Sequence, residues 1–296
     1  MNGREADHAG GEAKRSVRQQ VGAWLRGVNY TERLARYLGA ATMGSRWDRG
    51  VELLTEVPGS RVVVLAPHMD DETVGCGGLI RKMTESRKDV RVLFMTDGRQ
   101  GDRRLAELSG AEQVAHQAEL VATRKEEAKR ACRVLGVSAE YFLDEEDARL
   151  RSTETVRQAV SALLDDVNPD LVLTPFFTDE HADHKATAAI LLDLIAERRP
   201  AFMCLAYEVW TPLFPNVLVD ISDTAATKRE ALQAYRSQLK DNDLVSGVFG
   251  LNAYRHMALG GTGFAEAYWM GRAAEFLGLY RRHAGLQEIR DDSTYS

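Results

Sequence analysis

Short apolar runs alternate with longer segments of helical pattern along most of the chain. Five short runs predict buried strands: Val62–Leu65, Val90–Met95, Tyr141–Leu143, Leu171–Thr174 and Phe202–Val209. Four intervening segments predict helices: Thr73–Lys88, Leu120–Leu135, Thr153–Val167 and Asp183–Glu197. Strands that alternate with helices form a parallel sheet with right-handed crossovers. We therefore expect an α/β fold, a three-layer, Rossmann-like, doubly wound and mostly parallel sheet with helices on both faces.

The pattern weakens after residue 210. Val217–Ile221 predicts a last short strand, and a helix capped by Asp223 or Thr224 should follow it through Leu239. Leu244–Gly263 is rich in glycine and carries Tyr254, Arg255 and His256.

A cluster of titratable residues follows the first predicted strand. After Pro67 come His68, Asp70, Asp71 and Glu72, immediately before the next helix. Such groups are costly to bring together unless water or a cation screens them. A solvated turn with Asp71 or Glu72 as helix cap is one interpretation. The alternative is a divalent metal site, because His68 and Asp71, three residues apart, can converge from a tight turn and supply ligand atoms that suit zinc.

A second cluster repeats this architecture. His181, Asp183 and His184 follow the predicted strand Leu171–Thr174 and a proline, and they precede another helix. In open parallel sheets, ligands bind in the crevice at the carboxyl ends of the strands. Two such strand ends can face one crevice, so the second cluster supplies the further ligand that a metal site needs.

These motifs resemble those of the LmbE-like zinc de-N-acetylases, the family of N-acetylglucosaminyl-phosphatidylinositol de-N-acetylase (PIG-L). PHMDDE at residues 67–72 and HADH at residues 181–184 correspond to the usual forms (A/P)HPDDE and HPDH. The resemblance extends from about Arg61 to about Trp269. Met69 and Ala182 replace the family's prolines, and both are positions that shape the backbone and supply no chemistry.

The resemblance implies a role for each residue of the two clusters. His68, Asp71 and His184 would ligate Zn²⁺, or another divalent metal such as Fe²⁺, and Asp70 would be the general base. His181 would stabilise the oxyanion. Two further carboxylates, Asp183 and Glu72, would support these groups by hydrogen bonding.

Two arginines are candidate substrate contacts. The resemblance gives Arg124 this role, although a surface salt bridge with Glu126 or Glu127 is the alternative. Arg99 opens a loop with three arginines after the second predicted strand, where it would either face solvent or meet an anionic substrate group.

The implied reaction is hydrolysis of the N-acetyl group of an N-acetylglucosamine-type amino sugar or its conjugate, with release of acetate and a free amine. Two alternatives remain open: a catalytically inactive metal-binding or scaffold member of the same fold, and an amidohydrolase for a different acyl group. The partner would be a small-molecule or glycoconjugate substrate.

Composition bears on the partners and the cellular location of the protein. A net charge of −6 argues against a nucleic-acid partner, and no apolar run approaches the length of a transmembrane helix. The N-terminus lacks the apolar core of a secretory signal, and the three cysteines, far apart in the sequence, predict buried thiols. We expect a cytoplasmic protein.

The pattern also divides the chain. We expect a disordered tail at residues 1–19, a helical appendage that could form a homo-oligomer contact at residues 20–58, an LmbE-like domain at 59–285, and a loose tail at 286–296.

Overall fold

The structure, a computed structural model, describes residues 51–240 and 242–292. The chain divides into two compact units, residues 45–281 and residues 1–44 together with 282–296. The sheet and the candidate site lie in the first unit. The predicted disordered tail and most of the predicted helical appendage lie outside the described residues.

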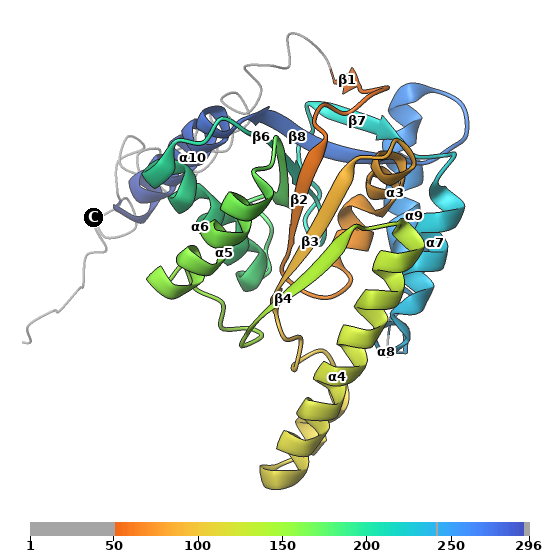
Figure 1. Ribbon diagram of the computed structural model, residues 1–296, viewed down its shortest axis with the longest axis vertical. Coiled ribbons are helices and arrows are strands. Elements are labelled where there is room, and N and C mark those ends of the chain that lie inside the picture. The colour runs from red at the N-terminus through yellow and green to blue at the C-terminus, as the bar shows by residue number, and fades with distance from the viewer. Residues whose placement is uncertain (1–50, 241, 293–296) are drawn as a thin grey trace, which may run out of the picture. The chain divides into compact units, whose positions relative to one another are not determined.

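One sheet organises the first unit, with the strand order β1-β7-β8-β6-β5-β2-β3-β4 among the described residues (Figure 1). The strands are β1 (Glu52–Leu53), β2 (Arg61–Ala66), β3 (Asp89–Thr96), β4 (Ala139–Glu145), β5 (Leu171–Pro175), β6 (Met203–Tyr207), β7 (Val217–Asp220) and β8 (Ala265–Arg272). The strand pairs are parallel except where β8 runs antiparallel between β6 and β7.

Helices cover both faces of the sheet. They are α3 (Asp71–Glu85), α4 (Gly110–Leu135), α5 (Glu154–Val167), α6 (Ala182–Arg198), α7 (Ala225–Ala234), α8 (Arg236–Leu239), α9 (Leu244–His256) and α10 (Ala273–Asp292), with short 3₁₀ helices at Arg103–Glu107 and Met257–Leu259. Figure 1 shows α5 and α6 on one side of the sheet and α3, α4 and α7 on the other. This confirms the predicted three-layer, mostly parallel α/β fold.

The central strands β2 and β5 are buried because both their faces are covered. Every residue from Val62 to Ala66 and from Leu171 to Leu173 is fully buried, as their continuous apolar sequence predicts. None of the described helices is long and apolar enough to cross a membrane.

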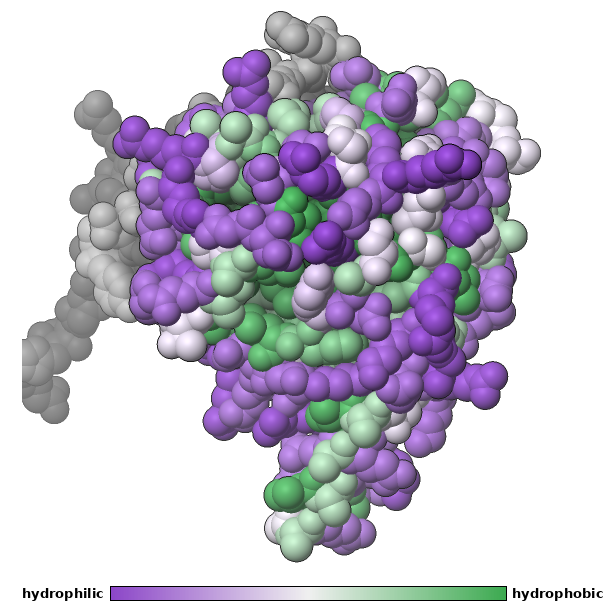
Figure 2. Space-filling model, in the orientation of Figure 1, coloured by the Kyte–Doolittle hydropathy of each residue, from purple (hydrophilic) through white to green (hydrophobic). Residues whose placement is uncertain are grey.

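Helix α4 starts ten residues before the predicted Leu120. None of its residues before Leu120 is buried, although Ala111, Val114, Ala115 and Ala118 recur there at helical spacing. Figure 1 shows this end of α4 extending away from the sheet, and Figure 2 shows hydrophobic side chains exposed there among hydrophilic ones. Val114, which is 65% exposed, belongs to this end.

Four predictions need correction. Val217–Ile221 is not the last strand, because β8 follows it. The helix expected through Leu239 is interrupted at Tyr235, whose ψ of 57° is not helical. Residues 51–58, the described part of the predicted helical appendage, contain the strand β1 and no helix. Residues 286–292, expected as a loose tail, continue α10.

Candidate active site

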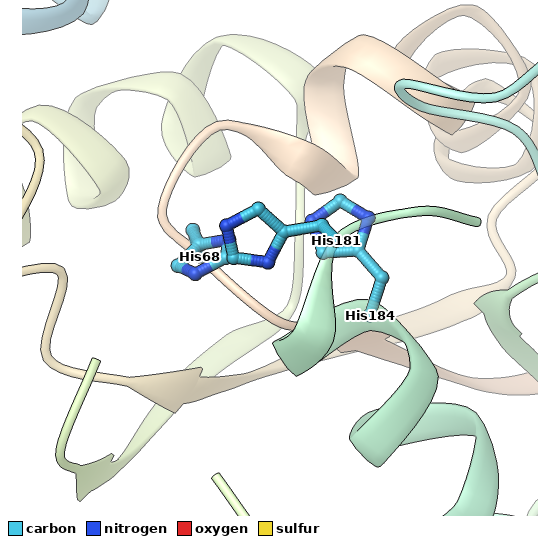
Figure 3. A group of neighbouring side chains, drawn as sticks. All are labelled: His68, His181 and His184. Atoms are coloured by element: carbon cyan, nitrogen blue, oxygen red, sulfur yellow. The ribbon is translucent and has the colours of Figure 1, made fainter. Parts of the chain in front are cut away.

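The two predicted clusters meet at one edge of the sheet. Strands β2 and β5 are parallel neighbours, with Val62 opposite Leu171, so their carboxyl ends lie side by side. His68 and Asp71 follow β2, and His181 and His184 lie at the start of α6, after β5. Figure 3 shows the rings of the three histidines next to one another. The crevice is therefore at the position that α/β sheets use for ligands.

The loop after β2 has a constrained backbone. Thr96 holds its start, because its amide and its Oγ1 donate to the carbonyl of Pro67 at 3.0 and 2.8 Å. Asp70 then adopts φ 136° and ψ −26°, which is unfavourable for a residue with a Cβ, and it directly precedes α3. Its side chain makes no capping hydrogen bond, so its carboxylate stays available at the site.

Asp71 lies between two of the imidazoles. Its Oδ2 is 3.1 Å from Nδ1 of His68 and 3.2 Å from Nε2 of His184. The three residues predicted as metal ligands therefore converge on one point. A carboxylate and two imidazole nitrogens are a donor set that suits a zinc ion or a similar divalent cation.

His184 provides an independent test of this fit. It is fully buried, yet neither ring nitrogen makes a hydrogen bond of good geometry. Oxygens of Asp71 and Asp179 lie 3.2 and 3.4 Å from its two nitrogens, as close ion-pair contacts. Buried polar atoms without hydrogen bonds are rare in native proteins, and a metal ion would satisfy one of these nitrogens. The residues present therefore fit a bound metal.

The arrangement offers other ligand combinations as well. Candidate ligand atoms of His68, His181 and His184 all lie within 4.8 Å of one another, and so do those of His68, Asp147 and Asp183. The centroid of the His181 ring is 4.7 Å from that of His68 and 4.8 Å from that of His184. His181, predicted to stabilise the oxyanion, is thus also close enough to act as a ligand to a cation bound between these rings.

The titration of these groups reflects their mutual contacts. Although burial acts against it, the charge of His184 holds the pKa of Asp71 far below its usual range. Burial likewise opposes the protonation of His184, but Asp71 and Asp179 raise its pKa to about 9. The carboxylate thus holds a protonated imidazole beside it. A cation that binds here takes over that charge and releases protons.

Asp70 differs from Asp71 in its surroundings. Burial raises the pKa of Asp70 to about 7, against the opposing charge of Arg124, whose Nη2 lies 3.6 Å from the Asp70 carboxylate. A carboxyl group with a pKa near neutrality can both accept and return a proton under physiological conditions. This is the property that the predicted general base requires.

Arg124, the first candidate substrate contact, is itself buried. It reaches from α4 and donates to the carbonyls of Met69 at 2.8 Å and Gly98 at 3.1 Å. It therefore ties the loop after β2 to the loop after β3. It also lines a cavity of about 240 Å³ with His68, Asp70 and Gln238, so contact with a substrate remains a prediction.

Arg99, the second candidate substrate contact, forms an ion pair with Asp97, the residue that follows strand β3. Its Nε donates to Asp97 at 2.6 Å, and it is not among the residues that line the cavity beside His68. Glu72 is fully buried, accepts from the hydroxyl of Tyr235 at 2.6 Å and from the amide of Asp70 at 3.2 Å, and so supports the loop.

Hydrogen bonds orient two of the histidines. Asp183 Oδ2 lies 3.1 Å from His68 Nε2, and the same carboxylate accepts from the amides of Ala148 and Leu150 at 2.8 and 3.2 Å. Nδ1 of His181 accepts from the amide of Asp183 at 3.2 Å. The proton of a neutral His181 ring is then on Nε2, which is free to donate to a substrate oxygen.

The sequence analysis missed two carboxylates of the site. Asp147, in the loop after β4, lies 3.2 Å from His68 Nε2, and Asp179, in the loop after β5, lies 3.4 Å from His184 Nδ1. Both follow the carboxyl end of a strand. That position was the available signal, but no motif distinguished these residues from ordinary loop aspartates.

Two buried charged residues, Lys228 and Glu266, contact the backbone of α3 on the two sides of a break in this helix. Cys76 has φ −144° and ψ 17°, which interrupts the helix five residues after Asp71 begins it. Nζ of Lys228 donates to the carbonyl of Val74 at 2.9 Å, before the break. The Glu266 carboxylate accepts from the amides of Gly78 and Leu79 at 2.8 Å, after it.

Lys228 and Glu266 also pair with each other, at 2.7 Å, and both are buried. A cation thus meets the carboxyl end of one helical segment and an anion the amino end of the next, as the helix dipole favours. The pair stabilises the short first segment, which carries Asp71.

The chain is similar to known deacetylases. The family model of GlcNAc-PI de-N-acetylase (PIG-L) matches residues 63–195. A diacetylchitobiose deacetylase from Thermococcus kodakarensis is 32% identical over 199 residues, which cover 62% of this chain and 71% of that protein. A probable N-acetyl-alpha-D-glucosaminyl L-malate deacetylase 2 from Bacillus cereus is 29% identical over 188 residues, or 60% of this chain and 83% of the relative.

The fold has a similar counterpart among solved structures. The N,N'-diacetylchitobiose deacetylase from Pyrococcus horikoshii superposes with a TM-score of 0.63 at 22% identity, over 89% of this chain and 96% of that one. Family match, sequence identity and paired His/Asp motifs at adjacent strand ends together show that the chain belongs to the PIG-L (LmbE-like) family.

Proposed function

We propose that the protein is a metal-dependent de-N-acetylase that hydrolyses the N-acetyl group of an N-acetylglucosamine-type amino sugar or its conjugate. One observation carries this proposal: Asp71 joins two imidazoles at the crevice, and the carboxylate of Asp70, which makes no capping hydrogen bond, lies beside them. The deacetylases among its relatives, which act on diacetylchitobiose and N-acetylglucosaminyl-malate by their names, support the choice of an amino sugar.

The proposed metal ligands are His68, Asp71 and His184. A divalent cation held by such residues supplies a water of lowered pKa and polarises the amide carbonyl. We assign zinc as the metal because imidazole nitrogen and carboxylate oxygen together suit it.

The protein's own groups would carry the protons. Asp70 accepts the proton of the attacking water and returns it to the nitrogen of the leaving amine, which its pKa near 7 permits. His181 donates from Nε2 to the carbonyl oxygen as negative charge develops on it. The C–N bond breaks, acetate carries the water oxygen, and the amine leaves with the transferred proton.

Asp70→Asn tests this assignment. The variant keeps the shape of the side chain and all three proposed ligands, so it should bind zinc as the native protein does. It should lose about 10²–10⁴-fold in kcat, the usual contribution of a general base. Acetate release from N-acetylglucosamine and its β-linked disaccharide measures the rate, and elemental analysis measures the metal.

Asp165→Asn is a matched control, because Asp165 is an exposed carboxylate on α5 whose contact is a surface ion pair with Arg198. It should leave kcat within about twofold, since surface ion pairs contribute little. A rate for Asp70→Asn similar to that of this control would show that Asp70 is not the base.

A further inference from the structure

A second cavity adjoins the proposed reaction centre. It measures about 400 Å³ and is lined by the start of α3, the loop after β6, the start of β8, and helix α9 with the residues just before it. Asp70, Asp71 and Trp210 line both this cavity and the smaller one beside His68. The two cavities therefore meet at the carboxylates where the amide bond would be cleaved.

Helix α9 gives the larger cavity an apolar wall. Leu244, Val248 and Leu251 all line it, and their spacing of four and three residues places them on one face of the helix. Val74 of α3 and Val209 after β6 line it as well.

Apart from Asp70 and Asp71 at the reaction centre, the charged residues that line this cavity are already engaged within the protein. Glu208 accepts from Arg255 Nε and from the amide of Leu213, both at 2.9 Å. Glu266 accepts from Lys228 and from two amides of α3, and Asp243 accepts from the amide of Ser246 at 3.1 Å as the cap of α9. Because these groups have their partners, the cavity offers a ligand mainly apolar contacts.

The smaller cavity has the opposite character. Gln100, Arg124, Asp147 and Gln238 line it together with the histidines, so it presents amide, guanidinium and carboxylate groups. An amide substrate has two ends, an amine and an acyl group. The hydroxyl groups of an amino sugar match the polar cavity, which leaves the apolar cavity for the acyl chain.

We infer that this cavity binds the acyl chain of the substrate, and that the enzyme hydrolyses N-acyl amino sugars with unbranched chains of about four to eight carbons more efficiently than N-acetyl ones. The inference rests on the proposed amide hydrolysis. A water-sized group occupies about 30 Å³, so an acetyl methyl would fill on the order of a tenth of the available volume. A longer chain fills space that an acetyl group leaves to water.

The experiment compares N-acetyl-, N-butanoyl-, N-hexanoyl- and N-octanoylglucosamine on the zinc-loaded protein, with release of free glucosamine as the common readout. Each methylene that leaves water should raise kcat/KM roughly fourfold until the cavity is full. A kcat/KM that stays level or falls from acetyl onward would overturn the inference while leaving deacetylation intact. No hydrolysis at any chain length would instead refute the proposed function, and the inference with it.

Two variants on α9 locate the effect. Leu251→Trp, in the cavity wall, should lower kcat/KM for the octanoyl substrate at least about tenfold more than it lowers kcat/KM for the acetyl substrate. Tyr254→Trp is the control, because Tyr254 is on the same helix, is 64% exposed and is not part of this wall. Equal losses with both substrates in Leu251→Trp, or the same selectivity change in the control, would exclude this cavity as the acyl site.

Calorimetry on Asp70→Asn separates binding from turnover. N-octanoylglucosamine should bind more tightly than N-acetylglucosamine to this variant, and the additional Leu251→Trp substitution should remove the difference. Equal affinities for the two sugars in Asp70→Asn itself would count against the inference independently of any rate.

Discussion

Replacement of Lys228 by methionine should destabilise the protein, because it leaves the buried carboxylate of Glu266 without its ion-pair partner. Lys228 is fully buried and Glu266 is 1% exposed. The ammonium group donates to the Glu266 carboxylate at 2.7 Å, to the Val74 carbonyl at 2.9 Å and to Asn252 Oδ1 at 3.0 Å. Methionine is of similar length but donates no hydrogen bond, so all three acceptors lose their charged donor.

The expected cost follows from the burial of the pair. Removal of one member of a buried ion pair costs about 3–5 kcal/mol, because the remaining charge stays desolvated without its partner. Total stabilities of native domains are about 5–15 kcal/mol. The Lys228→Met variant should therefore still fold at 25 °C, but with a large part of its stability lost.

Urea denaturation followed by circular dichroism measures this loss. Lys82→Met is a matched control on the surface of α3, where the ammonium group pairs with Asp223 at 2.5 Å and the two side chains are 29% and 67% exposed. The control should lose less than about 1 kcal/mol, as exposed ion pairs do. A second substitution, Glu266→Gln, should recover roughly half of the loss in Lys228→Met, since it removes the unpaired charge. Equal stabilities for Lys228→Met and Lys82→Met would refute the reasoning.

Two further predictions concern the cation and the base. Asp70 must be ionised to accept a proton. Burial raises its pKa to about 7, and a bound cation would lower it. We therefore expect kcat/KM to fall about tenfold for each pH unit below the pKa of Asp70, which lies at or below 7. A pH–rate profile that is level from pH 8 to pH 5 would contradict this. Removal of the metal by a chelator should abolish hydrolysis and lower the Tm, because a ligand present at 100 times its Kd stabilises the folded state by about 2.7 kcal/mol. Added zinc should restore both the activity and the Tm. The Tm of Asp71→Asn, which lacks a proposed ligand, should change little with the chelator or with zinc. An unchanged Tm of the native protein on chelation would argue against a resident metal.

The predictable parts of the fold were those with a local signature. β2 and β5 are continuous apolar runs because helices cover both their faces, so their sequences showed burial directly. Strand β8 had no such signature: its buried residues include Glu266, whose charge is balanced by Lys228 from α7. Helix α4 was predicted only from Leu120 onward; its earlier turns carry small apolar residues and one valine at helical spacing, and none of them is buried.

The same distinction applies to the candidate site. His68 and Asp71 are three residues apart, and His181 and His184 likewise, so each half of the site is recognisable within one loop. The motifs of the family then implied a role for each of these residues. Asp147 and Asp179 belong to no motif, and their contacts with the histidines depend on loops that the sheet order brings together.

The sequence by itself determined the alternation of buried strands and helices and the two His/Asp clusters, because both depend on neighbours along the chain. Tertiary structure alone decided that His68 and Asp183, 115 residues apart, lie in contact, that Lys228 and Glu266 stabilise the broken α3, and that an apolar cavity adjoins Asp70. The physical reason is that these features arise from side chains on different elements, whose contacts are set by strand order and packing and leave no periodic trace in any single segment.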